Sequence, residues 1–222
     1  LDDPKRFRPL VGQAHQVAMN MLRPISRKYD QAEHEYPVEL DELAKLAKQS
    51  RSTEKSADAE KSASDAPSVN GANMRGLLSA LEMSWGDVGL LLSIPGQGLG
   101  NAAIEAVANP EQLERFGDVW AAMAITEPEV GSDSGAIRTT AVRDGDEYVL
   151  NGEKIFVTSG ERAELVVVWA TLDRSLGKTA IKSFVVRRDN PGLQLARLEH
   201  KLGIRASDTA AFVLDDCRVP AE

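Results

Sequence analysis

The spacing of apolar residues changes once along this chain of 222 residues, close to Gly117 and Asp118. Before that point apolar residues recur every three or four positions, as they do on one face of a helix. After it, short runs rich in β-branched residues alternate with turn residues at a period of two. The sequence therefore predicts an α+β chain, with an N-terminal all-α helical domain over residues 1–118 and a β-barrel domain over residues 119–222.

The first half contains several amphipathic segments. Between Arg8 and Asp30 the apolar residues form one helical stripe, and Pro24 is expected to kink or divide that helix. A second helical stretch is expected after Pro37. Further helices are predicted over Met74 to Trp85, Val88 to Ile94 and Pro110 to Phe116.

Two segments interrupt the helical pattern. Residues 50–71 are rich in Ser with charged residues and almost no large apolar side chain, which predicts a mobile loop. Gly96, Gly98 and Gly100 resemble part of a dinucleotide-binding loop, but Asn101 stands where the third glycine would be needed. A helix-breaking turn or close helix packing is the better interpretation of these glycines.

Turn residues divide the second half into short strands. Asp144-Gly145 and Asn151-Gly152 are favoured turn dipeptides and predict two successive hairpins. Several short strands at regular spacing are typical of a sandwich or barrel of about 100 residues. The predicted strands are Thr139 to Arg143, Glu147 to Leu150, Lys154 to Thr158, Leu165 to Ala170, Ile181 to Val186, Leu193 to Leu198 and Thr209 to Leu214.

Composition excludes several classes of function. The net charge of −8 disfavours nucleic acid and anionic lipid as partners. With one cysteine, Cys217, and three scattered histidines, neither an internal disulfide nor a protein-held metal site is expected. No apolar run approaches the ~20 residues needed to span a bilayer, and the first residues show no secretory pattern, so a cytoplasmic location is expected.

Two segments of the second half carry the chemistry. Ala124 to Asp133 ends in Gly131, Ser132 and Asp133, a loop whose amide and hydroxyl donors suit phosphate and carbonyl oxygens, although the tripeptide alone is only a turn. In Lys154 to Gly160, strand alternation places Phe156 and Thr158 on one face, which suits a planar ring with a polar edge. By spacing alone, an aromatic core residue beside a strand threonine is the commoner explanation.

Taken together, these segments resemble the acyl-CoA dehydrogenase family from about Trp120 to Pro220. The resemblance extends through Asp146 to Lys154, Pro191-Gly192, Lys201 to Ser207 and Asp215 to Pro220. It departs from the family at Val130, where a small residue is usual, and at Phe156, where the family usually has Trp. The resemblance implies a bound FAD, with flavin contacts from Met123, Ala124, Ile125, Thr126, Gly131, Ser132, Phe156, Val157 and Thr158, and with Ser132 also at the CoA substrate.

The resemblance also implies a reaction. Family members are flavoprotein oxidoreductases of fatty acid and lipid metabolism that convert an acyl-CoA to a trans-2-enoyl-CoA, often as tetramers, with electron-transferring flavoprotein as acceptor. Their catalytic Glu belongs to a C-terminal four-helix bundle that would follow the barrel, so we assign no catalytic residue here. On this basis we expect the bundle to be missing after Glu222 and the isolated chain to be inactive.

Two other functions stay open at the level of the sequence. One is a non-catalytic or oxygen-reactive flavoprotein subunit of the same fold, in a homo- or hetero-oligomer. The other is a non-enzymatic interaction module built from the helical and barrel domains. Acyl chain length and branching preference cannot be predicted from these residues.

Overall fold

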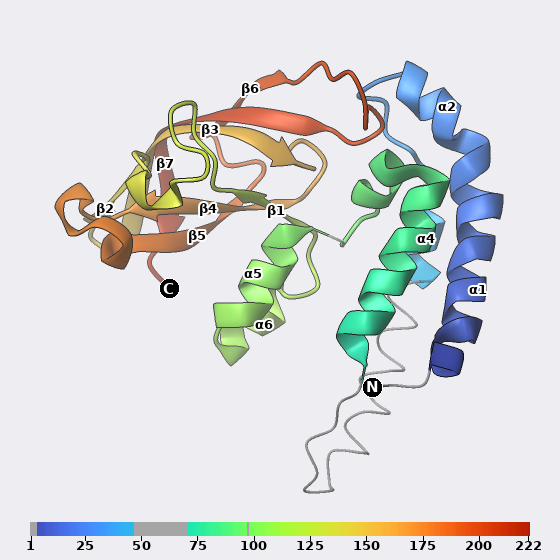
Figure 1. Cartoon of the computed structure of the whole chain (residues 1–222). Helices are drawn as coiled ribbons and strands as arrows, with labels where there is room; N and C mark the ends of the chain where they lie inside the picture. Colours follow the sequence, from blue (N-terminus) through green and yellow to red (C-terminus); the bar gives the residue numbers. More distant parts are fainter. Residues whose placement is uncertain (1–3, 47–70, 97) are drawn as a thin grey trace, which may run out of the picture. The chain divides into compact units, whose positions relative to one another are not determined.

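The computed structural model describes residues 4–46, 71–96 and 98–222 (Figure 1). The chain forms two compact units. One is the helical unit, Leu1–Ile94 with Leu202–Ala206, and the other is the sheet unit, Pro95–Lys201 with Ser207–Glu222. The predicted mobile loop over residues 50–71 lies, apart from Gly71, outside the described residues.

The helical unit begins with one long helical run. A short 3-10 turn, Pro4–Phe7, leads into α1 (Arg8–Val17), a π-helical turn η2 (Ala18–Leu22) and α2 (Arg23–Gln31). Pro24 lies in the first turn of α2. Because proline has no N–H, it cannot donate a hydrogen bond to a carbonyl of the preceding turn. The predicted disturbance at Pro24 is therefore confirmed, and it takes the form of the preceding π turn.

A second helical layer completes this core. Residues 40–46 are helical and bury Leu40 and Leu43 against Leu22 and Tyr29. The long helix α4 (Ala72–Leu92) is interrupted at Asp87, whose φ of −173° and ψ of 120° are not helical. The Asp87 carboxylate accepts a hydrogen bond from the N–H of Leu90 at 2.9 Å and so caps the second part of the helix.

The sheet unit starts with two helices, and the first of them packs on its first strand. These helices are α5 (Leu99–Val107), which the sequence analysis did not predict, and α6 (Pro110–Phe116), which it did. Ile104 of α5 packs with Ala121, Leu165 and Val167 of the sheet. Both helices precede residue 118 in the sequence, but by their contacts they group with the sheet. The domain division at residue 118 therefore stays a prediction, based on the change from helices to strands.

Glycine allows α5 to approach the sheet closely. A Cβ atom at Gly100 would lie 2.6 Å from the carbonyl oxygen of Ala121, which is closer than real Cβ contacts. Asn101 supports the same approach, because its side chain donates to the carbonyl of Val119 at 2.7 Å and accepts from the N–H of Ala121 at 2.9 Å. Close helix packing, one of the two interpretations of this glycine segment, is therefore confirmed.

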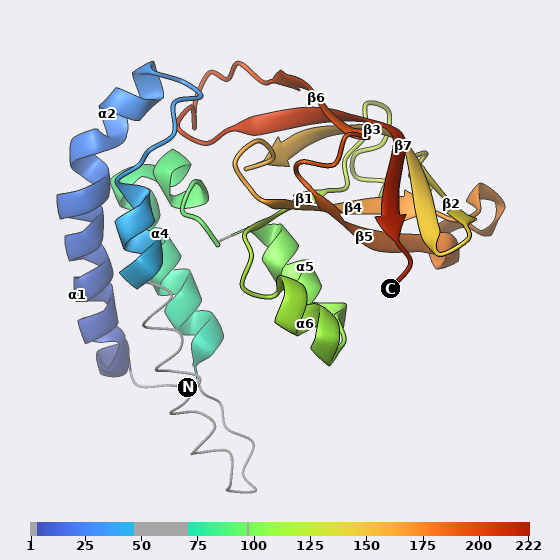
Figure 2. The same ribbon diagram turned by 180° about the vertical axis from the view of Figure 1, so that it is seen from behind.

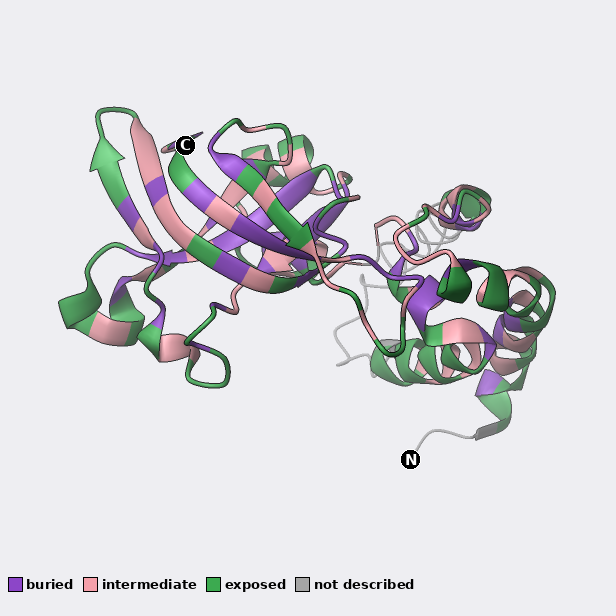
Figure 3. Ribbon diagram, turned by 90° about the horizontal axis from the view of Figure 1, so that it is seen from above, coloured by how far each residue is buried: buried purple, intermediate pink, exposed green. Residues whose placement is uncertain are grey.

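Seven strands form one curved sheet, an open half-barrel (Figures 2 and 3). Their order is β1-β4-β2-β3-β7-β6, and β5 pairs with β4. Strand β4 is almost wholly buried and runs parallel to β1. The bounds are β1 (Ala121–Ala124), β2 (Thr140–Asp144), β3 (Glu147–Thr158), β4 (Leu165–Thr171), β5 (Ile181–Arg187), β6 (Leu193–Leu198) and β7 (Thr209–Pro220), with 3-10 turns at η3 (Ser134–Ala136) and η4 (Arg174–Ala180).

One of the two predicted hairpins is wrong. The β2–β3 hairpin is confirmed, with Gly145 at a φ of +63° in its turn. Asn151-Gly152, however, lies within β3, which continues through a register shift against β7. The Asn151 side chain accepts from the N–H of Asp216 at 2.9 Å, and this bond across the strands uses the group that would otherwise stabilise a turn.

No helix among the described residues is long and apolar enough to cross a membrane.

Candidate functional site

The two motif segments predicted from the sequence lie side by side. The N–H of Ile155 on β3 donates to the carbonyl of Thr126 at 2.9 Å. The Nζ atom of Lys154 donates to the carbonyl of Ile125 at 3.1 Å. The segment that leaves β1 is therefore bonded to β3 just before Phe156, although 29 residues separate Ile125 from Lys154 in the sequence.

A β-bulge sets the orientation of Phe156 and Thr158. Lys154 pairs with Phe212 and Val157 pairs with Ala210, so β3 has one more residue than β7 over this stretch. Phe156 takes a φ of +59°, an unusual value for a bulky side chain. It is 59% exposed, and Thr158 is exposed as well, whereas Val157 between them is buried.

The surface formed by Phe156 and Thr158 fits a planar aromatic cofactor. An exposed aromatic ring on a strand offers a face for stacking, and a hydroxyl two residues later offers a hydrogen bond at the edge of the stacked ring. Both residues are exposed around a buried Val157, which agrees with the predicted alternation over these three residues, although the bulge interrupts it before Phe156, since Lys154 is buried. The positive φ at Phe156, which accompanies it, was not predicted.

The donor loop after β1 begins with a tight turn. Glu127 and Val130 exchange backbone hydrogen bonds of 2.9 and 3.1 Å, and Val130 is buried. Gly131, Ser132 and Asp133 follow and are exposed. The bulky side chain at position 130 therefore points into the protein and leaves the backbone of Gly131 and Ser132 accessible.

The other predicted contacts differ in exposure. Met123, Ile125 and Thr126 are half-buried, and Ala124 is buried like Val157. The accessible members of the predicted set are thus Gly131, Ser132, Phe156 and Thr158, with Thr126 and its neighbours partly accessible.

A buried ion pair, which was not predicted from the sequence, holds this site. The Nζ atom of Lys154 lies 2.7 Å from Oε1 of Glu127, and the two side chains are 0% and 4% exposed. The Glu127 carboxylate also accepts from the N–H groups of Arg138 at 2.7 Å and Thr139 at 2.9 Å. The only signal for this pair in the sequence was a lysine within a predicted strand, together with a glutamate in a short predicted loop.

Hydrogen bonding offsets the cost of burying these charges. Burial alone would raise the pKa of Glu127, but the bonds from Lys154, Thr139 and Arg138 outweigh it and hold the pKa below its ordinary value. Burial lowers the pKa of Lys154, and the bond to Glu127 opposes that effect. The carboxylate is already an acceptor for three donors, so Glu127 is poorly placed to act as a free base.

A second buried carboxylate organises the turn that follows Thr158. Asp208 is fully buried and accepts from the N–H of Glu161 at 2.9 Å. Its carbonyl accepts from the N–H of Ser159 at 3.1 Å, and Arg162 lies 3.4 Å from its carboxylate. Burial raises the pKa of Asp208, against the opposing effects of the Glu161 bond and Arg162.

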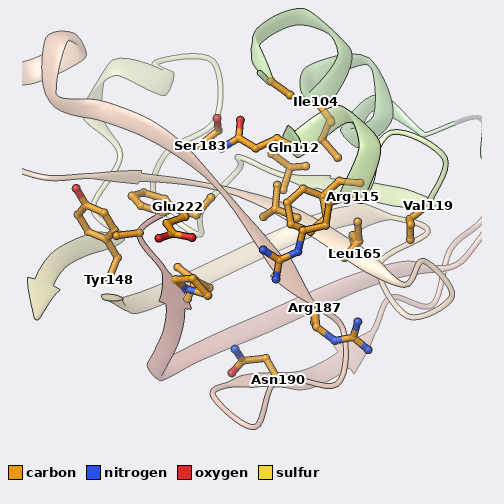
Figure 4. A pocket seen from close by; sticks show the side chains of 18 of the residues that line it. Ile104, Gln112, Arg115, Val119, Tyr148, Leu165, Ser183, Arg187, Asn190 and Glu222 are labelled. Atoms are coloured by element: carbon orange, nitrogen blue, oxygen red, sulfur yellow. The ribbon is translucent and has the colours of Figure 1, made fainter. Parts of the chain in front are cut away.

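A cavity of about 650 Å³ lies elsewhere in the sheet unit, between α5 and α6 on one side and β4, β5 and the end of β7 on the other (Figure 4). Apolar residues such as Ile104 and Leu165 line it together with Arg115 and Arg187. Arg187 is paired with Asp189, and Arg115 stacks over Phe116. None of the nine predicted flavin contacts lines this cavity.

Comparison with known proteins identifies the class of protein that this fold defines. A family model, "Acyl-CoA dehydrogenase, middle domain", matches residues 122–217. The curved sheet thus matches the middle domain of the acyl-CoA dehydrogenase family.

Individual relatives agree with this assignment. Over 106 residues the chain is 44% identical to the short-chain specific acyl-CoA dehydrogenase of Clostridium acetobutylicum, covering 48% of this chain and 28% of that protein. Butyryl-CoA dehydrogenase from Megasphaera elsdenii has a similar structure, with a TM-score of 0.79 and 26% identity, over 100% of this chain and 58% of that chain. Glutaryl-CoA dehydrogenase from Mycobacterium smegmatis, solved in complex with FADH2, gives a TM-score of 0.76 and 27% identity, over 100% of this chain and 55% of that chain.

The chain thus spans just over half the length of these solved relatives, and its match covers a little over a quarter of the curated one. The helical unit and the curved sheet together match the solved structures over the whole length of this chain.

Proposed function

We propose that this chain binds FAD and serves the α,β-dehydrogenation of an acyl-CoA thioester to a trans-2-enoyl-CoA. The observation that carries the proposal is the bonding of the Ile125–Thr126 segment to β3 beside the outward-facing Phe156 and Thr158. The match of residues 122–217 to the acyl-CoA dehydrogenase middle domain supports it, as does the similarity to a glutaryl-CoA dehydrogenase solved in complex with FADH2.

Each accessible residue has a proposed task. Phe156 stacks against the ring system, and the hydroxyls of Thr158 and Thr126 donate to its polar edge. The exposed amides and hydroxyl of Gly131 and Ser132 hold phosphate or carbonyl oxygens where cofactor and CoA meet. Met123, Ala124, Ile125 and Val157 complete the proposed set of cofactor contacts as the supporting layer.

FAD would supply the acceptor for the hydride that leaves the β-carbon of the substrate. The protein residues have to orient the thioester, hold its carbonyl as enolate charge develops, and exclude water. We assign no catalytic base among the described residues. Glu127 is bonded to three donors, and Glu129 is paired with Arg138.

The substrate and partner assignments are also proposals. We propose an acyl-CoA as substrate, electron-transferring flavoprotein as electron acceptor, and a homo- or hetero-oligomeric assembly. The family resemblance supports each of them, and none depends on the geometry of a single residue.

The test is flavin binding by the purified chain. We expect added FAD to be taken up, with quenching of its fluorescence, and we expect Phe156→Ala to weaken uptake about fivefold or more, since an aromatic contact of this kind contributes about 1 kcal/mol beyond its buried area. Val142→Ala is the matched control, because Val142 is a similarly exposed apolar residue on β2. A chain that takes up no FAD would contradict the proposal and favour an interaction module.

A second measurement separates the flavoprotein functions. Anaerobic bleaching of the bound flavin by an acyl-CoA, with slow reaction toward oxygen, is expected for a dehydrogenase. Rapid reoxidation by oxygen would favour an oxygen-reactive relative. FAD binding without any bleaching, even in the full assembly, would favour a non-catalytic subunit.

A further inference from the structure

Glu127 and Lys154 are absent from the predicted flavin contacts, yet their side chains hold both ends of the segment that carries several of them. At one end, Lys154 donates to the carbonyl of Ile125 at 3.1 Å. At the other, Glu127 accepts from the N–H groups of Arg138 and Thr139 at 2.7 and 2.9 Å. The 2.7 Å bond between the two side chains joins these anchors.

The same pair also fixes the start of the exposed loop. Glu127 closes the turn with Val130 through two backbone bonds, and Gly131 to Asp133 follow directly. Because both side chains are almost fully buried, water cannot replace the bonds if one partner is removed. The exposed loop thus depends on a buried anchor directly behind it.

We propose that Glu127 and Lys154 are positioning residues that hold residues 125–139 against β3 in the conformation that binds flavin. Neither side chain touches the cofactor in this proposal. It rests on the proposed function, because the flavin contacts of Thr126, Gly131 and Ser132 are themselves proposed. It adds to that function the residues that preorganise the site.

Loss of Lys154 and loss of both charges have different expected consequences. In Lys154→Met the carbonyl of Ile125 loses its donor and the Glu127 carboxylate loses its counterion. In Glu127→Gln/Lys154→Met the buried charge is removed, so stability should recover in part. The carbonyl of Ile125 still lacks its donor, so the loop stays poorly held. Stability and flavin affinity should therefore separate in the double variant.

The first experiment is hydrogen exchange of the flavin-free chain. We expect the amides between residues 126 and 139 to exchange about tenfold faster or more in Lys154→Met, because a buried bond to a charged group is lost. Leu193→Ala is the matched control, since it removes buried side-chain volume from β6, at the edge of the sheet farthest from β1 in strand order. Glu127→Gln serves as a second variant if Lys154→Met does not fold.

The second experiment is FAD titration of the same proteins. Lys154→Met and the double variant should each bind FAD about tenfold more weakly than the parent, with an altered visible circular dichroism of the bound flavin. Leu193→Ala should bind FAD as the parent does, even where its stability is lower. A purely structural role would instead make affinity follow stability, with recovery in the double variant.

The outcomes separate this inference from the proposed function. If the parent takes up no FAD while Lys154→Met still accelerates exchange in residues 126–139 alone, the proposed function fails and the anchoring by the pair stands, without its flavin role. If exchange in that segment is the same in Lys154→Met, Glu127→Gln and Leu193→Ala, the positioning role is overturned, whatever the parent does with FAD. Equal FAD affinity in Lys154→Met and the parent would also overturn it.

Discussion

Lys154 and Glu127, 27 residues apart in the sequence, form a buried ion pair with a distance of 2.7 Å between Nζ and Oε1. Two buried charges of this kind are costly to separate, because removing either one leaves the other without a counterion in an apolar interior. In this fold the pair joins β3 to the segment between β1 and β2. The stability of the sheet unit at acidic pH should therefore depend on it.

The first prediction concerns acid unfolding. The folded-state pKa of Glu127 lies below its ordinary value of 4.5, so the carboxylate stabilises the fold fully above that value, and the contribution is lost as pH falls through the folded pKa. Urea unfolding measured at a series of acidic pH values should show a shallower loss of stability in Glu127→Gln than in the parent. An identical slope in the two proteins would contradict the assignment.

Asp208 should show the opposite sign. Burial raises its pKa above the ordinary value of 3.8, so between 3.8 and the raised pKa the folded state binds more protons than the unfolded chain. Its contribution to the free energy of unfolding therefore falls as pH rises through that window. Asp208→Asn should remove this fall, which a comparison of the pH slopes in the two proteins will show. Absolute stability is less informative, because Arg162 also loses its counterion in the variant.

The close approach of α5 to β1 makes a third prediction. Gly100→Ala should destabilise the sheet unit by about 1–3 kcal/mol, because the added Cβ meets the rigid backbone carbonyls of Ala121 and Ala122. Gly12 is also a helical glycine, but a Cβ atom there meets nothing within 4 Å. Gly12→Ala should therefore stabilise its helix by about 0.5–1 kcal/mol. Thermal unfolding of both variants measures the two signs, and destabilisation of equal size in both would refute the packing argument.

Much of this architecture could be predicted because its signals are local. The helical stripe before Pro24 and the β-branched runs of β4 and β5 each specify their own element, since the side-chain period follows from local geometry. Asn151-Gly152 was misassigned because a turn dipeptide carries no information about Asp216, the residue across the sheet that binds Asn151. Local patterns predict elements better than they predict pairings.

The site divides in the same way. The exposure of Phe156 and Thr158 around a buried Val157 could be predicted because alternation is a local property, whereas the bulge between Lys154 and Val157 depends on the pairing with β7. The Lys154–Glu127 pair could not be predicted, because charged residues are exposed by default and only the fold brings these two together. The buried position of Val130 likewise depends on the turn that Glu127 closes.

The last prediction sets stability against function at Phe156. Its φ of +59° is costly for a bulky side chain and free of steric cost for glycine, and its 59% exposure means that the ring contributes little to the core. Phe156→Gly should therefore leave the free energy of unfolding unchanged or raise it by about 1 kcal/mol, while FAD binding weakens because the stacking face is lost. Phe156→Ala also removes the ring but does not relieve the strain. It should therefore bind FAD as weakly as Phe156→Gly does and be less stable. Denaturant unfolding of the two variants measures their stability, and FAD titration measures their affinity. A Phe156→Gly protein that is less stable than Phe156→Ala would show that the side chain does not strain the backbone at this bulge.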